Sequence, residues 1–251
     1  MTKNICCIIL AILLLFYVLK LENNYNSRVN TGHHNIFWSG GYDSTFMLLK
    51  RVIIEKKCVN PIYLNFQSVD GVSIRRQNVN FELSAMKKTI DELHRIGYGA
   101  RVMPLKIVTD LQLTPEVLSA TTKLYQMGYL QRPISQYTHM IQYSLDKNII
   151  IDEGAEKSYH STSYKMVNKY LNKDMMLDLN QVYNTPLYVI RNLRFPIINL
   201  TKHDMLNIAK KYKFDYILRW TKSCWLPAVD GSPCGKCIMC KDRIIPETFV
   251  G

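Results

Sequence analysis

Residues 39–45 read Ser-Gly-Gly-Tyr-Asp-Ser-Thr, and no other stretch of the chain narrows the choice of fold so much. The apolar residues 36–38 before it predict a short buried strand, and the largely apolar run at 46–54 predicts a helix. A strand, a glycine-rich turn and a helix together form a cradle for anions, because glycine lets the backbone approach a ligand and the first N–H groups of the helix point at it. We therefore expect phosphate or pyrophosphate to bind at this turn.

Other phosphate-binding loops fit this turn less well. The Walker pattern requires a lysine before its final Ser or Thr, and none stands there; the Gly-x-Gly-x-x-Gly pattern of dinucleotide sites is also absent from the turn. The structural alternative is an ordinary strand-to-helix turn in which Ser and Asp side chains cap the helix. The phosphate site is favoured because hydroxyls and glycines stand together between a strand and a helix.

Four cysteines gather near the carboxy terminus: Cys224, Cys234, Cys237 and Cys240. Four thiolates at this spacing predict a closed tetrahedral zinc site that holds the fold together. An iron–sulfur cluster is the weaker alternative, because its usual run continues with x-x-x-Cys-Pro and residues 241–244 are Lys-Asp-Arg-Ile. Disulfides and scattered core cysteines explain the clustering less well.

The rest of the chain alternates predicted strands with predicted helices. Strands are expected at 61–66, 101–105 and 148–152, and helices at 75–95, 137–145 and 201–211. This alternation predicts an α/β fold, a parallel sheet with helices on both faces. Ligands bind such sheets at the carboxyl ends of the strands, so the turns at 39–45 and 152–156 should lie together. Thr201 and Asp204 predict a capping box, which gives Asp204 and its neighbour His203 structural roles.

Residues 5–19 form an uncharged apolar run between Lys3 and Lys20. The run is short for a transmembrane helix, which needs about 20 residues, and no small-residue cleavage site follows it. We expect residues 1–21 to be an uncleaved membrane anchor with the catalytic domain in the cytoplasm; a removed signal, and with it export, is the alternative. Residues 22–34 would then be a linker, 35–215 the main domain and 216–251 a zinc-binding region.

The chain is strongly basic. Its formal net charge is +12, of which residues 1–30 contribute +2. A positive body suits polyanionic partners, among them nucleotides, nucleic acid and an anionic membrane surface, and does not choose among them. The hydrophobic content of 47% is sufficient for the core of one large domain.

Several of these stretches resemble known families. The turn at 39–45 resembles the pyrophosphate loop of the PP-loop ATP pyrophosphatases, which have an adenine-nucleotide alpha-hydrolase-like fold. Three further stretches are similar to one branch, the 7-cyano-7-deazaguanine synthases of the queuosine pathway. They are Phe-Pro-Ile-Ile-Asn-Leu-Thr-Lys at 195–202, Tyr-Ile-Leu-Arg-Trp at 216–220 with Ser-Cys-Trp at 223–225, and Cys-Gly-x-Cys-x-x-Cys-x-x-Arg at 234–243.

The resemblance implies a reaction, its cofactors and its partners. Such an enzyme adenylates a carboxylate, releases pyrophosphate and uses ammonia to form first an amide and, after a second activation, a nitrile. The acid would be 7-carboxy-7-deazaguanine or a related heterocycle, with ATP, Mg²⁺ and Zn²⁺ as cofactors and a homodimer as the assembly.

The resemblance also implies site residues. Asp43 and Ser44 would act at the reacting centre, with Asp43 nearest the magnesium ion, and Arg132 and Glu156 would face the substrate. The ATP phosphates would be bound by Ser39, Gly40, Gly41, Asp43, Ser44 and Thr45.

The chain departs from this family where the substrate is expected to bind. The family's Phe-Asp-Tyr-Gly-Gln is replaced by Phe-Gln-Ser-Val-Asp at 66–70, and its Gly-Ala-Asn by Gly-Ala-Glu at 154–156. Because the loop and the cysteines are kept, two alternatives stay open. One is adenylation of another acceptor, such as a base in RNA or DNA. The other is a non-catalytic, membrane-tethered protein that binds zinc and nucleic acid.

Overall fold

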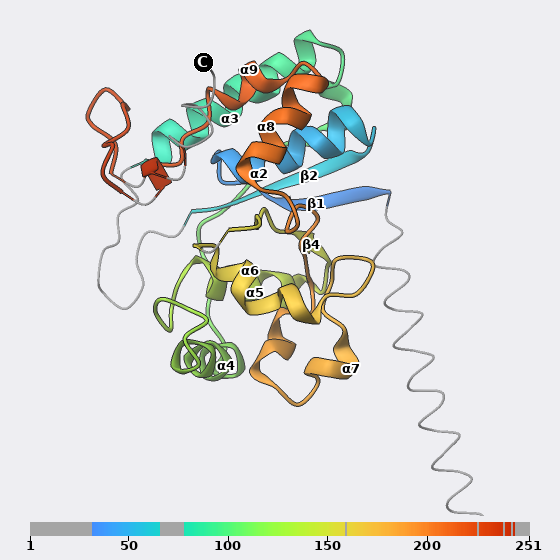
Figure 1. Ribbon diagram of the computed structural model, residues 1–251, viewed down its shortest axis with the longest axis vertical. Helices are drawn as coiled ribbons and strands as arrows, with labels where there is room; N and C mark the ends of the chain where they lie inside the picture. Colours follow the sequence, from blue (N-terminus) through green and yellow to red (C-terminus); the bar gives the residue numbers. More distant parts are fainter. Residues whose placement is uncertain are drawn as a thin grey trace, which may run out of the picture. The chain divides into compact units, whose positions relative to one another are not determined.

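Five strands form one sheet in the order β3-β2-β1-β4-β5 (Figure 1). They are β1 His33–Phe37, β2 Cys58–Leu64, β3 Lys106–Val108, β4 Ile151–Asp152 and β5 Leu193–Arg194. The pairs β1 with β4, β2 with β3, and β4 with β5 are parallel. The parallel sheet expected from the alternation of strands and helices is thus confirmed. The direction of strand order reverses between β1 and β4, which is where open α/β sheets bind their ligands.

This computed structural model describes residues 32–65, 78–158, 160–224, 226–237, 239–241 and 243. Contacts separate residues 1–33 from residues 34–251, and the sheet and its helices belong to the second unit, apart from the first residue of β1. The predicted anchor at 1–21, most of the predicted linker at 22–34 and the divergent stretch at 66–70 lie outside the described residues.

Helices cover both faces of the sheet, as expected (Figure 1). One face carries α2 Tyr42–Leu49, α3 Val79–Arg95, α8 Lys202–Lys211 and α9 Asp215–Leu218; the other carries α4 Pro115–Gln126, α5 Gln136–Lys147, α6 Thr162–Val167 and α7 Leu179–Val182. A π-helical turn, Lys50–Ile54, continues α2, and short 3₁₀ turns occur at Gly99–Arg101, Asn168–Tyr170 and Pro186–Ile190.

Each face of the sheet has its own hydrophobic core. Ile36 packs into the cluster under α2, α3, α8 and α9, and its neighbour Phe37 packs into the cluster under α4 to α7. Successive residues of a strand point to opposite faces, so β1 joins the two cores through alternate side chains. This double burial makes β1 a rigid support for the turn that follows it.

Two strand predictions were misplaced. The third strand lies at 106–108 and not at 101–105, because Pro104 has no N–H to give the ladder. Val102 forms only an isolated bridge with Val59 before pairing resumes. The strand predicted at 148–152 is reduced to its last two residues, since Asn148 takes a left-handed conformation and ends α5.

The predicted helices agree better with the structure. The helix expected at 75–95 runs over Val79–Arg95, with Asn78 at its N-cap. The capping box at the start of α8 is confirmed: Asp204 N donates to Thr201 Oγ1 over 3.1 Å, and Thr201 N donates to Asp204 Oδ2 over 2.9 Å. The box fixes where α8 begins, and therefore fixes the position of its first residue, Lys202.

The expected membrane anchoring is corrected. Among the described residues, no helix combines the length and the apolar character needed to cross a bilayer. Residues 5–19, on which the expectation depended, lie outside those residues. We propose neither a transmembrane anchor nor export for this protein.

Candidate functional site

The turn after β4 touches the start of α2 through Gly154, and the turn after β1 touches α3 through Gly40. Gly40 has φ +69°, and a Cβ atom there would lie 2.9 Å from the carbonyl oxygen of Glu82. A Cβ atom on Gly154 would lie 3.0 Å from both N and Cα of Ser44, in the first turn of α2. Both positions therefore require glycine, the first for conformation and space and the second for space alone. The expected meeting of residues 39–45 with residues 152–156 is confirmed.

The two serine hydroxyls of the turn bond within the turn, whereas the threonine hydroxyl bonds to a side chain of the core. Ser39 Oγ and Ser44 Oγ lie 3.0 Å apart, and Ser39 N donates to Ser44 Oγ over 3.2 Å. Thr45 is buried, and its Oγ1 accepts a hydrogen bond of 2.9 Å from the indole of Trp38. The serine hydroxyls thus close the turn, whereas the hydroxyl of Thr45 already has a partner in the core.

Lys202, the first residue of α8, brings the two turns together electrostatically. Its Nζ donates to Asp43 Oδ1 over 2.6 Å and to Glu156 Oε2 over 2.7 Å. Burial alone would lower the pKa of Lys202, but the two carboxylates outweigh it and the pKa is raised. The ammonium group is therefore charged at neutral pH, inside a cluster that also contains two acids.

The three acidic residues after β4 have different surroundings. Asp152 is fully buried and accepts 2.9 Å and 2.5 Å hydrogen bonds from Arg51 and Arg194, so its role is structural. Burial raises the pKa of Glu153 to about 8, and the charge of Asp43 adds to this. Burial, followed by the charge of Asp43, also raises the pKa of Glu156 to about 7 against the opposing effect of Lys202. Two carboxyl groups beside the turn thus titrate near neutral pH.

A segment near the carboxy terminus completes the turn. The backbone N–H of Tyr42, at the start of α2, donates to Ser223 Oγ over 3.1 Å. The N–H of Lys222 donates to the carbonyl oxygen of Gly40 over 2.9 Å. The start of α2 therefore lies against residues 222–223 as well as against the turn after β4.

The four cysteines form a compact cluster. The sulfurs of Cys224, Cys234, Cys237 and Cys240 all lie within 4.8 Å of one another, an arrangement that could hold a metal ion. The described cysteines form no disulfide. Hydrogen bonds from the N–H groups of Lys236 and Cys237 lower the pKa of Cys234 to about 6, which favours the thiolate that a metal requires. Gly235, with φ +69°, supplies the left-handed residue inside this knuckle.

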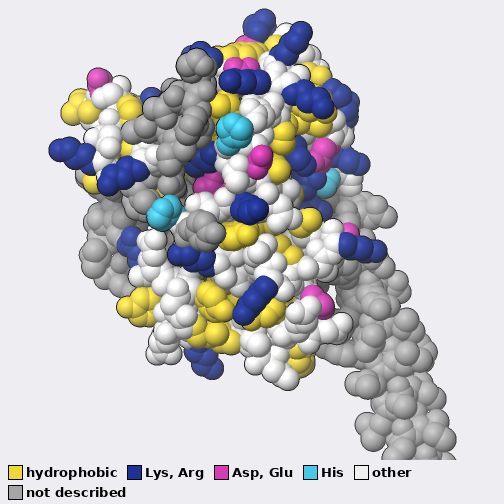
Figure 2. Space-filling view, in the orientation of Figure 1, with side chains coloured by type: hydrophobic (Ala, Val, Ile, Leu, Met, Phe, Trp, Pro, Cys, Tyr) yellow, Lys and Arg dark blue, Asp and Glu magenta, His cyan; other side chains and the backbone are white. Residues whose placement is uncertain are grey.

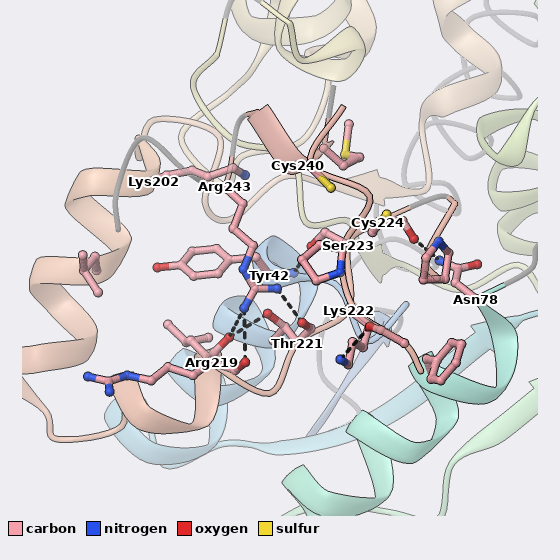
Figure 3. Close-up of a pocket in the computed structure, with 18 of the residues that line it drawn as sticks. Tyr42, Asn78, Lys202, Arg219, Thr221, Lys222, Ser223, Cys224, Cys240 and Arg243 are labelled. Carbon is pink, nitrogen blue, oxygen red and sulfur yellow. Dashed lines mark hydrogen bonds between the residues drawn. The ribbon is translucent and has the colours of Figure 1, made fainter. Parts of the chain in front are cut away.

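The cluster is tied to the helices around it. Asn78 Nδ2 donates to the carbonyl oxygen of Cys224 over 3.1 Å and to Glu82 Oε1 over 2.7 Å. Beyond the last cysteine, Arg243 donates to the carbonyl oxygens of Thr221 over 2.5 Å and Arg219 over 3.2 Å, at the end of α9 (Figure 3). The cysteines, α3 and α9 are therefore parts of one hydrogen-bonded assembly.

The two predicted substrate residues differ in burial. Glu156 is buried beside Lys202 and Asp43, whereas Arg132 is exposed between α4 and α5. Among the described residues, Arg132 makes no hydrogen bond or ion pair with the turn. Lys202 and Ser223 were not singled out as site residues. Their only signal in the sequence was their place in stretches that resemble a family, since neither stands near the turn along the chain.

Comparison with known proteins identifies the carboxy-terminal part. Residues 170–245 match the family model described as "Queuosine biosynthesis protein QueC". These residues are similar to that family, and the match covers less than half of the chain. The matched stretch contains Lys202, Ser223 and all four cysteines, so the contacts that reach the turn from α8 and from residues 222–223 come from it.

One curated relative agrees with this assignment. The 7-cyano-7-deazaguanine synthase of Pelobacter propionicus is 38% identical over 53 residues, which are 21% of this chain. The match spans 23% of the length of that relative. The resemblance to the QueC branch expected from the carboxy-terminal motifs is thus confirmed.

Two solved structures have a similar course of the chain. An NMN synthetase from Francisella tularensis matches with 13% identity and a TM-score of 0.39, over 87% of this chain and 76% of that one. The U34-tRNA thiolase NcsA from Methanococcus maripaludis, solved with its [4Fe-4S] cluster, matches with 13% identity and a TM-score of 0.41, over 93% of this chain and 73% of that one. TM-scores below 0.5 say nothing about what this chain binds.

Proposed function

We propose that the chain is an ATP-dependent synthase that adenylates a heterocyclic carboxylate. In this proposal 7-carboxy-7-deazaguanine or a close relative attacks the α-phosphorus of ATP, and pyrophosphate leaves. Ammonia then displaces AMP to give an amide, and a second adenylation of the amide oxygen, followed by loss of AMP, gives the nitrile. The organic acid loses both oxygens to the two AMP molecules, so the atoms balance without any oxidant or reductant.

One observation carries the proposal: residues 170–245, which match the QueC family model, contact a turn that lies far outside them. Lys202 reaches Asp43, Ser223 reaches the first N–H of α2, and Lys222 reaches Gly40. A turn that merely joined a strand to a helix would not need a largely buried lysine and two carboxylates beside it. The arrangement supports a site at which negative charge builds up during reaction.

The residues of the turn fit the departing pyrophosphate. Backbone N–H groups at the start of α2 and the hydroxyls of Ser39 and Ser44 are the donors that an anion requires. Lys202 would hold charge on the phosphate oxygens with its ammonium group. Donors fixed in advance stabilise the charge of a transition state more than water does, because they need no reorganisation.

The expected cofactors fit the side chains that are present. Four cysteine sulfurs within 4.8 Å of one another suit a tetrahedral zinc ion. All four positions would be filled by protein, so zinc would hold the fold and would not bind substrate. The carboxylates of Asp43 and Glu156 are the oxygen ligands that magnesium prefers. Magnesium would neutralise phosphate charge there.

The non-catalytic alternative is less well supported. Lysine and arginine side chains are spread over the face seen in Figure 2 and do not gather into one stripe. A nucleic-acid-binding module would also leave the ion pairs of Lys202 with Asp43 and Glu156 without a purpose. Adenylation of a base in RNA or DNA uses the same turn and differs only in the acceptor.

The test is acid-dependent release of AMP. The full chain is incubated with ATP, Mg²⁺, ammonia and 7-carboxy-7-deazaguanine; AMP and pyrophosphate are quantified and the nitrile is sought by mass spectrometry. We expect AMP formation that requires the acid, together with the mass of 7-cyano-7-deazaguanine. AMP formation that requires RNA or DNA would show that the acceptor is a nucleic acid and not the heterocyclic acid. The absence of any AMP would refute the proposal.

A further inference from the structure

A cavity of about 610 Å³ lies beside the turn, bounded by α8, α9 and the cysteine cluster (Figure 3). Tyr42 and Lys202 line it. Tyr42 belongs to the turn at residues 39–45, and Lys202 forms the ion pairs beside that turn. Lys222, whose backbone holds Gly40, lines the cavity as well. The cavity therefore adjoins the turn at residues 39–45, although Ser39, Asp43 and Ser44 of that turn do not line the cavity.

The wall of the cavity is strongly basic. Five cationic side chains line it against one acidic side chain, Asp215: Lys202, Lys210, Arg219, Lys222 and Arg243. Asp215 lies 3.7 Å from Arg219, and Lys202 is engaged with Asp43 and Glu156. Within the described part of the chain, Lys210 and Lys222 form no ion pair. The cavity thus has an excess of positive charge that an anion would neutralise.

Much of the remaining wall is apolar, although Asn78, Thr221 and Ser223 are polar, and it includes two aromatic rings. Tyr42 and Phe81 contribute rings, and Leu206, Leu218 and Met239 contribute aliphatic surface. Tyr42 lies beside Lys202 in Figure 3, with Lys202 Nζ 5.6 Å from the centre of its ring. An apolar cavity with a few charged groups is the usual form of a small-molecule site, and flat rings favour a flat ligand.

Resting on the proposed function, we propose that this cavity binds the acceptor acid, a small planar heterocyclic carboxylate. The rings of Tyr42 and Phe81 pack against the heterocycle, and the basic wall balances its charge. The end of the cavity at Tyr42 and Lys222 is next to the turn, so a carboxylate there is adjacent to the nucleotide's phosphates. The acid and the nucleotide thus occupy neighbouring sites that share Lys202.

The experiment measures binding apart from reaction. Isothermal titration of the full chain with 7-carboxy-7-deazaguanine, in the absence of ammonia and with a non-hydrolysable ATP analogue, gives the Kd of the acid. Leu206→Trp fills the cavity from α8, and Asn207→Trp adds the same ring one residue along on an exposed position that does not line it. We expect Leu206→Trp to weaken binding of the acid at least about tenfold and Asn207→Trp to change it less than about twofold.

A second pair of variants tests the charge of the wall. Lys210→Glu and Lys211→Glu change the net charge equally, but only Lys210 lines the cavity. Lys210→Glu should weaken binding of the acid about tenfold, and Lys211→Glu should leave it within about twofold. Equal effects of the two variants would show a general attraction by the basic surface and would overturn the proposal.

Failure of the inference is distinguishable from failure of the proposed function. Binding of the acid that depends on Leu206, without AMP formation, supports the cavity assignment and refutes the reaction. A chain that binds the ATP analogue but not the acid refutes the cavity assignment. A Leu206→Trp variant that loses the ATP analogue but still binds the acid also refutes it. So does a wild-type chain that binds an RNA oligonucleotide but never the acid, if Leu206→Trp abolishes that RNA binding.

Discussion

Lys202 Nζ lies 2.6 Å from Asp43 Oδ1, across 159 residues of sequence. The ion pair joins the first turn of α2 to the first residue of α8, and Glu156 shares the same ammonium group. Under the proposed function, this cation is the group that would meet negative charge on the nucleotide. Its removal is therefore the most direct test of the site.

Lys202→Met should lower the rate of pyrophosphate release about 100-fold or more, the usual effect of deleting one charged donor to a transition state. Lys211→Met, in the last turn of the same helix, serves as the matched control and should keep the wild-type rate. Circular dichroism would establish that both variants are folded. A wild-type rate in Lys202→Met would show that the ion pair is only structural.

Asp43→Ala should abolish pyrophosphate release while the protein stays folded. Asp43 is half-buried at the start of α2, and its loss leaves Lys202 paired with Glu156, so little stability is lost. Added Mg²⁺ should not restore the rate. Unchanged turnover would refute the role assigned to this carboxylate.

Gly154→Ala should disrupt the site by contact alone. Its Cβ would lie 3.0 Å from backbone atoms of Ser44, which cannot rotate away, so we expect a loss of about 1–3 kcal/mol in unfolding free energy. The first turn of α2 would shift, and pyrophosphate release would fall. Gly128→Asn is the control, because asparagine tolerates the left-handed conformation there and no atom lies within 4 Å of its Cβ. Urea titrations that give equal stabilities for Gly154→Ala and the wild type would contradict this.

The sequence allowed the sheet, its helices and the turn to be predicted because each depends on local pattern. Alternating burial placed Ile36 and Phe37 in separate cores, and Thr201 with Asp204 marked the start of α8. Boundaries were less predictable: Pro104 delays the start of β3 and Asn148 ends α5, at positions that the apolar runs did not reveal.

The contacts of the site could not be predicted in the same way. Lys202 and Ser223 meet the turn only because α8 and residues 222–224 pack beside α2, and no spacing along the chain encodes that packing. Arg132 stays a prediction that depends on the resemblance alone, since the structure shows only that its side chain is exposed.

Cys237→Ser should release bound metal and lower the thermal stability of the full chain. The four sulfurs form one closed set, and the carbonyl oxygen of Cys224 is held by Asn78 on α3. Losing a structural metal site removes folding free energy directly. Cys58→Ser, in β2 and outside the cluster, should retain the metal. Elemental analysis of the purified proteins identifies the metal, and full metal content in Cys237→Ser would disprove the four-cysteine site.

The stability of the protein should depend on the protonation of Glu153. Its pKa rises from an ordinary 4.5 to about 8 in the folded chain, so the folded state keeps a proton that the unfolded state releases in this range. The contribution of Glu153 is therefore complete below about pH 4.5 and is lost as the pH rises through about 8. Glu153→Gln, which stays neutral, should gain stability relative to the wild type as the pH rises from about 5 to about 8.5.

Melting temperatures of the two proteins across this range provide the measurement. The difference between them isolates Glu153, because His34, whose pKa is lowered to about 4 mainly by burial, titrates alike in both. A constant difference across the range would mean that Glu153 is ionised throughout.

The bond between the Tyr42 N–H and Ser223 Oγ joins residues 181 positions apart. A ribosome releases the amino-terminal residues first, so α2 and its glycine turn emerge well before α8 and Ser223 are made. The residues of β1 and α2 are therefore available to fold early. The site around them can form only after almost the whole chain has been synthesised. A chain truncated before residue 202 would have the turn without the groups that complete it.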